Sequence, residues 1–158
     1  MLRRLAATSM IAAAGLTGGC LDSSAPGDPV PIEKTNFASA LGVDLAASTR
    51  TANGAYYRDI TVGTGATVAT GQSVDVRYTG WLSNGTQFDS NVNNPGPFTF
   101  SLGSGFVIPG WDETIPGMKV GGRRQLIIPP SLAYGRFGYG PIPGNAVIVF
   151  NVEVVAAR

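Results

Sequence analysis

Apolar and polar residues alternate along much of the chain after residue 54, which predicts β-strands with one buried face. The segment SVDVRYTGW (73–81) shows the alternation clearly, and PFTFSL (97–102) repeats it. Asn84-Gly85 lies between such runs and is a strong hairpin signal, because both residue types accept the positive φ of a tight turn. Two further runs, RRQLIIP (123–129) and AVIVFNVEVV (146–155), predict strongly apolar strands.

One short helix is expected among these strands. Residues 111–115 favour a helix, and Pro116 and Gly117 prevent it from continuing. The whole pattern predicts about five or six strands around one small helix, which is an antiparallel α+β domain over residues 54–158.

Residues 33–53 are predicted to form an N-terminal helical extension before this domain. Phe37, Leu41 and Leu45 recur at i, i+4 and i+8, which is the spacing of one helix face, and Gly42 interrupts or ends the pattern. We therefore expect a short amphipathic helix whose apolar side packs on the domain or on a partner.

The first residues are typical of an export signal. Arg3 and Arg4 form a charged start, and Leu5–Leu16 is an apolar run too short for a stable membrane span, which needs roughly 20 residues. We predict a signal peptide over residues 1–19. Residues 20–32 are rich in Ser, Pro, Asp and Gly, and this composition favours an extended tether.

Cys20 is the single cysteine, and Gly18-Gly19 before it resembles a bacterial lipobox, although Thr17 stands where leucine is usual. The sequence therefore predicts lipidation of Cys20 and a membrane-anchored lipoprotein facing the periplasm. Leu21, which is not the aspartate of an inner-membrane retention signal, favours the outer membrane. The alternative is cleavage near Ala12–Ala14, which leaves a soluble periplasmic or secreted protein with a free thiol.

Composition excludes several kinds of chemistry. With no histidine and one cysteine, no histidine-based nucleophile, histidine metal site or thiolate cluster can form, and we expect neither metal nor cofactor. Without residues 1–19 the chain has nine basic and ten acidic side chains, which argues against a nucleic-acid partner. Asp112 and Glu113 are adjacent, and we interpret them as acids favoured near a helix N-terminus, not as an acid–base pair.

One kind of catalysis suits this inventory, because it needs no nucleophile and no metal. Rotation about an Xaa-Pro bond is slow, since resonance gives the C–N bond double-bond character and a barrier of about 18–20 kcal/mol. An apolar pocket that grips proline and desolvates the amide favours the twisted, less conjugated state over the planar one.

Three segments resemble the FKBP-type peptidyl-prolyl isomerases, over roughly residues 56–156. They are VRYTGWLSNGTQFDS, PFTFSLGSGFVIPGWDETIPGMKVGGRRQLIIPPSLAYG and IPGNAVIVFNVEVV. The resemblance implies a curved antiparallel sheet wrapped around a short helix, with a pocket between them. It also implies isomerisation of Xaa-Pro bonds in polypeptide substrates, here during protein folding in the bacterial envelope, and macrolide ligands of the FKBP type.

The resemblance assigns roles to individual residues. Trp111 is similar to the tryptophan at the pocket floor, Asp89 to the acid that meets Tyr78 near the substrate amide, and the N–H of Ile108 to a donor for a ligand carbonyl. The expected catalytic residues are Tyr78, Phe88, Asp89, Trp111, Tyr134 and Phe150, and the expected substrate-binding residues are Phe98, Val107, Ile108 and Ile142.

The loop GRFGYGPIPGN (135–145) departs from the family, because it is about one residue shorter than the common form and has Tyr139 where histidine is frequent. This departure puts sequence preference and macrolide affinity in doubt more than the pocket floor. A second hypothesis remains open, in which the domain binds proline-containing segments, or acts as a chaperone, without catalysis.

Overall fold

The alternating segment around residue 75 forms β3 (Ser73–Leu82), the strand on which the sheet is organised. In the computed structural model, which describes residues 28–158, β3 pairs along its length with β7 (Ile148–Ala157). On the opposite edge of β3, β5 (Phe98–Ser101) pairs with its first half and β4 (Gln87–Ser90) with its second half. This one strand therefore pairs with β4 and β5, which follow it in the sequence, and with the distant β7.

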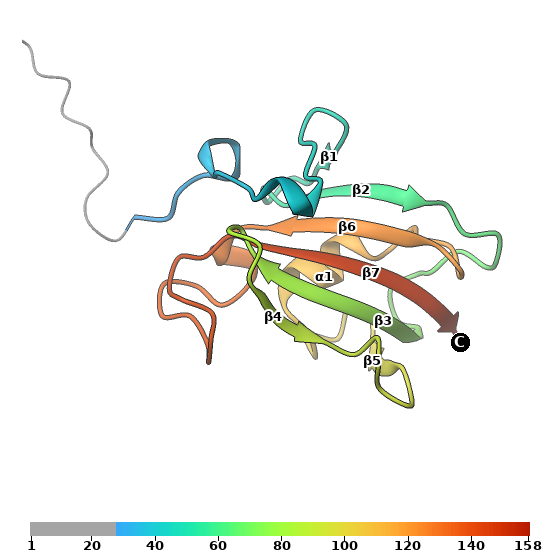
Figure 1. The fold of residues 1–158 in the computed structure, drawn as a ribbon. Coiled ribbons are helices and arrows are strands. Elements are labelled where there is room, and N and C mark those ends of the chain that lie inside the picture. Colours follow the sequence, from blue (N-terminus) through green and yellow to red (C-terminus); the bar gives the residue numbers. More distant parts are fainter. Residues whose placement is uncertain (1–27) are drawn as a thin grey trace, which may run out of the picture.

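The sheet continues from β7 to β6 (Arg123–Ile128), β2 (Tyr56–Thr61) and β1 (Thr49–Arg50), in the order β1-β2-β6-β7-β3-β4 with β5 beside β3. Every pairing is antiparallel, and the strands form a curved sheet (Figure 1). The predicted α+β class is confirmed. Within the described residues the sheet has seven strands, one or two more than expected, since a two-residue strand such as β1 carries no alternation.

The Asn84-Gly85 hairpin forms as predicted between β3 and β4. Gly85 has φ 89°, and the Leu82 N–H donates to the Thr86 carbonyl at 2.9 Å across the turn. Glycine suits this turn because a Cβ disfavours positive φ.

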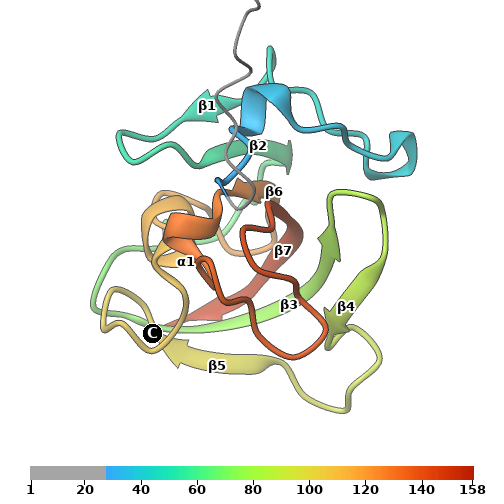
Figure 2. The ribbon, with the colours of Figure 1, turned by 90° about the vertical axis from the view of Figure 1, so that its left-hand side faces the viewer.

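The predicted helix is α1 (Pro109–Thr114), which begins two residues earlier than expected and ends before Pro116. It lies against one face of the curved sheet (Figures 1 and 2), and we call this the inner face. Close approach to the sheet depends on Gly110, because a Cβ there would lie 2.5 Å from Cγ2 of Ile128 on β6. The helix is thus seated directly on the sheet.

The C-terminal end of α1 is held by Arg124, a buried arginine of β6. Its Nη1 donates to the Thr114 carbonyl at 2.7 Å, and its Nε and Nη2 bind the Asp59 carboxylate at 2.7 and 3.0 Å. Its guanidinium also lies 4.4 Å from the Tyr57 ring centroid. A bidentate pair of this kind fixes geometry as well as charge, so the helix is fastened to β6 and β2 at the end opposite the pocket.

Strand periodicity divides the sheet between two apolar clusters. Leu126 and Phe150 are cross-strand partners and pack on α1 at the inner face. Their neighbours Ile127 and Val149 are also partners, but they join Tyr56 in a second cluster on the outer face. Because successive side chains of a strand point to opposite faces, β6 is buried on both sides.

The N-terminal extension covers the outer cluster, but not as the predicted amphipathic helix. The structure has two single-turn 3-10 helices, Ile32–Lys34 and Ser39–Leu41, and otherwise irregular backbone up to β1. Gly42, in the left-handed region at φ 58°, ends the second turn, so the i, i+4, i+8 spacing of Phe37 and Leu45 is coincidental. Their side chains nevertheless pack on the outer cluster with Leu41 and Val43.

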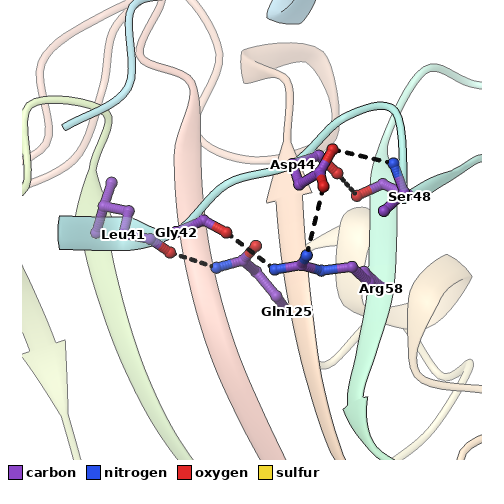
Figure 3. A network of polar contacts seen from close by, with 7 residues as sticks. Leu41, Gly42, Asp44, Ser48, Arg58 and Gln125 are labelled. Carbon is purple, nitrogen blue, oxygen red and sulfur yellow. Dashed lines mark hydrogen bonds and ion pairs between the residues drawn. The ribbon is translucent and has the colours of Figure 1, made fainter. Parts of the chain in front are cut away.

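Polar side chains of the sheet hold this extension in place (Figure 3). Gln125 donates to the Leu41 carbonyl at 2.7 Å, and Arg58 donates to the Gly42 carbonyl at 2.9 Å. Arg58 also reaches the Asp44 carboxylate at 3.9 Å. Backbone carbonyls without helical partners need other donors, and β2 and β6 supply them. The sheet itself begins at Thr49, which is inside the range 33–53 predicted for the extension.

Candidate functional site

A cavity of about 390 Å³ opens between the inner face of the sheet, α1, the loop that precedes the helix and the loop between β6 and β7. Its size lies in the range of small-molecule and peptide pockets, which are concave and largely apolar. Eight of the ten predicted pocket residues line it. They are Tyr78, Asp89, Phe98, Val107, Ile108, Trp111, Tyr134 and Phe150, and Phe106 is a ninth residue of the wall.

Trp111 on α1 forms the base of the cavity. Only 4% of its surface is exposed, and its ring meets Tyr78 and Phe150 nearly edge-on, with centroids 5.1 and 5.2 Å apart. Phe100 packs on it at 5.7 Å from within the core. Edge-to-face contacts of this type are favourable because the positive ring edge meets the negative ring face. Trp111 thus belongs to the core and to the cavity together.

Tyr78 and Asp89 supply the polar part of the wall. Tyr78 on β3 donates its hydroxyl to Oδ2 of Asp89 on β4 at 2.7 Å, as the resemblance implied. Burial, the hydrogen bond to Asp89 and the negative charge of Asp89 raise the pKa of Tyr78 above its ordinary value. Tyr78 therefore remains a protonated donor across the physiological range of pH.

Tyr134 follows the 3-10 turn Pro130–Leu132 and carries a second hydroxyl into the wall. Burial first, then the charge of Asp89, raises its pKa. Tyr139, from the loop of residues 135–145, stacks on Tyr134 with ring centroids 5.7 Å apart and planes inclined by 17°. This loop thus contributes an aromatic side chain behind the pocket wall.

Ile108 immediately precedes α1 and accepts a hydrogen bond from the Trp111 N–H at 2.9 Å through its carbonyl. Among residues 28–158, no protein acceptor takes the N–H of Ile108. A backbone donor on the wall of an apolar cavity is suited to orient a carbonyl of a bound chain.

Two predicted pocket residues do not line the cavity. Phe88 lies behind the wall, where its ring packs edge-on against Phe150 at 5.5 Å. Ile142 is 5% exposed and belongs to the inner core. The resemblance placed both near the pocket, but their side chains support its walls and do not form them.

Gly80 on β3 is a site residue that sequence reasoning missed. A Cβ at Gly80 would lie 2.6 Å from a carbon of Phe150 and 2.7 Å from one of Phe88. Only glycine lets these two rings meet across the strand. A glycine inside a strongly alternating strand is the signal that could have revealed it.

Phe106 and its loop were also missed. Asp112, expected only as an acid near the helix start, accepts the N–H groups of Gly103 and Gly105 at 2.7 and 3.2 Å. These bonds tie the loop to α1 just before Phe106, whose surface is 72% exposed at the cavity mouth. Gly103 and Gly105 have φ 79° and 73°, which suits glycine.

Other predicted features concern metals and membranes. In the part of the chain from residue 28 onward, no cluster of His, Cys, Asp and Glu is suited to hold a metal ion. None of the helices in that same part is both long and apolar enough to span a bilayer. Cys20, the signal peptide and most of the tether lie outside the described residues.

Comparison with known proteins agrees with this geometry. Residues 65–155 match the model of the FKBP-type peptidyl-prolyl cis-trans isomerase family. An FK506-binding protein of Neisseria meningitidis serogroup B is 46% identical over 103 residues, which cover 65% of this chain and 94% of the relative. The structure of AtFKBP13 superposes with a TM-score of 0.65 at 38% identity, covering 70% of this chain and 98% of that one. The chain belongs to the FKBP-type peptidyl-prolyl cis-trans isomerase family.

Some relatives are much longer than the shared domain. FK506-binding protein 4 of Rhizopus delemar is 50% identical over 111 residues, which are 70% of this chain but 29% of that protein. The chain thus spans less than a third of this relative.

Proposed function

We propose that this chain accelerates cis–trans isomerisation of Xaa-Pro bonds in polypeptides that fold in the bacterial cell envelope. The observation that carries the proposal is the aromatic cavity over Trp111, with the hydrogen-bonded Tyr78 and Asp89 on its wall. The family is a family of enzymes for this reaction, and the cavity has the apolar walls that the reaction requires.

The chemistry follows from how the imide changes during rotation. The planar imide is polarised by resonance, whereas the twisted one is less conjugated and less polar. A proline ring resting on Trp111, between Phe98 and Phe150, is removed from water, and this environment favours the twisted state. No covalent bond forms and no proton must leave the substrate.

The polar groups of the wall orient the chain that carries the proline. The Ile108 N–H is placed to bind a carbonyl, and the Tyr134 hydroxyl, kept protonated by its raised pKa, offers a further hydrogen bond. Asp89, held by Tyr78, would lie beside the imide of a bound substrate. We assign these residues a positioning role and assign the rate acceleration chiefly to the aromatic walls.

NMR exchange spectroscopy on Xaa-Pro peptides with the full chain tests the proposal directly. We expect faster cis–trans exchange at catalytic amounts of protein. A rate equal to that in buffer, with a folded protein, would contradict it. Peptide binding without acceleration would favour the alternative of a non-catalytic module.

We further propose that FK506-type macrolides occupy the same cavity, because several relatives are named for this binding. The macrolide should inhibit the exchange reaction competitively and quench Trp111 fluorescence. Trp81 on β3 is the second tryptophan of the chain and also fluoresces. The Trp81→Phe variant therefore isolates the signal of Trp111. Inhibition that does not depend on substrate concentration would contradict a shared site.

For the location we propose export and lipidation at Cys20, supported by the charged start, the apolar run and the cysteine that ends it. Mass spectrometry of the mature N-terminus tests this, with Cys20→Ser as the control. A mature chain that begins near residue 15 without lipid would contradict the anchor.

A further inference from the structure

Phe106 is a large apolar side chain at the mouth of the cavity, 72% exposed and yet part of the cavity wall. An exposed phenylalanine gains little from folding, since most of its surface stays in water. The backbone of its loop is nevertheless held, because Asp112 ties Gly103 and Gly105 of the same loop to α1. The loop thus presents an unburied aromatic ring beside the proline pocket.

We propose that Phe106 selects substrates with a large apolar or aromatic side chain at the residue that follows the proline. The proposal rests on the proposed function and concerns the same site. Such a side chain would pack against the exposed ring of Phe106 and remove apolar surface of both partners from water.

The direction in which the substrate peptide runs through the site follows from the reaction. Rotation turns the carbonyl of the residue before proline, so a fixed donor on that carbonyl would hold it in one isomer. The Ile108 N–H is therefore expected to bind the carbonyl of the proline itself, which need not move. Phe106 lies two residues before Ile108 on the same loop, so it flanks the chain that leaves the proline toward its C-terminus.

The polar groups of the wall differ chemically from Phe106. Asp89 and Tyr134 also line the cavity, and Tyr139 stacks on Tyr134. In the proposed arrangement these polar groups would face the part of the substrate that rotates. Phe106, the exposed apolar group of the wall, would flank the part that stays fixed.

The test compares peptides that differ only after the proline, with Phe, Gly or Glu at that position. NMR exchange spectroscopy gives kcat/KM for each peptide without a coupled protease, so this residue can be varied freely. Chemical-shift titration gives Kd in the same samples. With the full chain we expect the Phe peptide to exceed the Gly peptide by roughly three- to tenfold in kcat/KM.

Phe106→Gln should reduce this Phe-to-Gly ratio to about one. Phe137→Gln is the matched control, because Phe137 is 82% exposed on the neighbouring loop but does not line the cavity, and it should keep the ratio. A ratio that persists in Phe106→Gln, or a preference that appears only before the proline, would overturn the proposal. If the chain accelerates no peptide but Kd shows the Phe106-dependent preference, the proposed function fails while this inference stands.

Discussion

The Tyr78 hydroxyl donates a 2.7 Å hydrogen bond to the Asp89 carboxylate, joining β3 to β4 at the wall of the cavity. The two residues are eleven positions apart and lie on either side of the Asn84-Gly85 hairpin. The hairpin register therefore decides whether the pair forms.

Replacement of Asp89 by Asn should lower kcat/KM by about tenfold, since the amide still accepts the Tyr78 bond but removes the negative charge from the cavity wall. The side chain is exposed, so the free energy of unfolding should change by less than about 1 kcal/mol. Exchange rates and urea titrations of the same sample separate these effects. Asp28→Asn, at an exposed position before the fold begins, is the control. An unchanged rate would remove Asp89 from the site.

Alkaline pH should destabilise the protein through Tyr78. Its pKa is raised on folding, so the folded state holds the proton more tightly than the unfolded state does. The resulting stability is present below the unfolded pKa of 10.0 and is lost as pH rises above it. Urea titrations at successive pH values above 9 should show a shallower loss for Tyr78→Phe than for the parent chain. Equal slopes would contradict the contribution of Tyr78.

Replacement of Trp111 by Leu should reduce both stability and ligand affinity, because the ring serves the core and the cavity base. We expect a loss of about 2–4 kcal/mol in unfolding free energy and a fall in kcat/KM of at least about tenfold. Phe100→Leu is the matched control, since Phe100 packs on Trp111 but does not line the cavity. It should destabilise without a comparable loss of catalysis. A Trp111→Leu protein with unchanged catalysis would exclude Trp111 as the base.

A methyl group at Gly80 should displace the Phe150 ring. Because the added Cβ would lie within 2.7 Å of both Phe150 and Phe88, we expect Gly80→Ala to cost about 1–3 kcal/mol of stability. It should also weaken peptide binding, measured by chemical-shift titration. Gly96→Ala has open space around the new Cβ and should change neither quantity. Wild-type binding by Gly80→Ala would show that Phe150 does not need this space.

Removal of the N-terminal extension should destabilise the sheet. Deleting residues 1–48 uncovers Tyr56, Ile127 and Val149 and removes the buried Ile32, so a loss on the order of 3–5 kcal/mol is expected. Deletion of residues 1–27, which keeps the whole described part of the chain, is the comparison. Equal stability of the two truncated chains would mean that the extension only rests on the outer face.

Local pattern predicted the elements near the site well. Alternation in residues 73–81, the Asn-Gly turn and the proline-limited helix correspond to β3, the hairpin and α1. Each of these depends on backbone preferences within a few residues, which a sequence displays directly. The amphipathic helix predicted for the N-terminal extension was wrong. The backbone carbonyls of Leu41 and Gly42 are bound by Gln125 and Arg58 of distant strands, and the local sequence does not display such contacts.

For the cavity itself, the sequence alone determined which residue types were present: aromatic side chains at period-two positions, one tryptophan behind a Pro-Gly turn, and no histidine. The tertiary structure decided which of them share a wall. Trp111 becomes the base because Gly110 lets α1 approach Ile128, Phe88 stays behind Phe150 because Gly80 leaves room for both rings, and Phe106 reaches the mouth because Asp112 holds its loop. These are contacts between separate elements of the fold, and their distances depend on strand register and close packing, which no local pattern records.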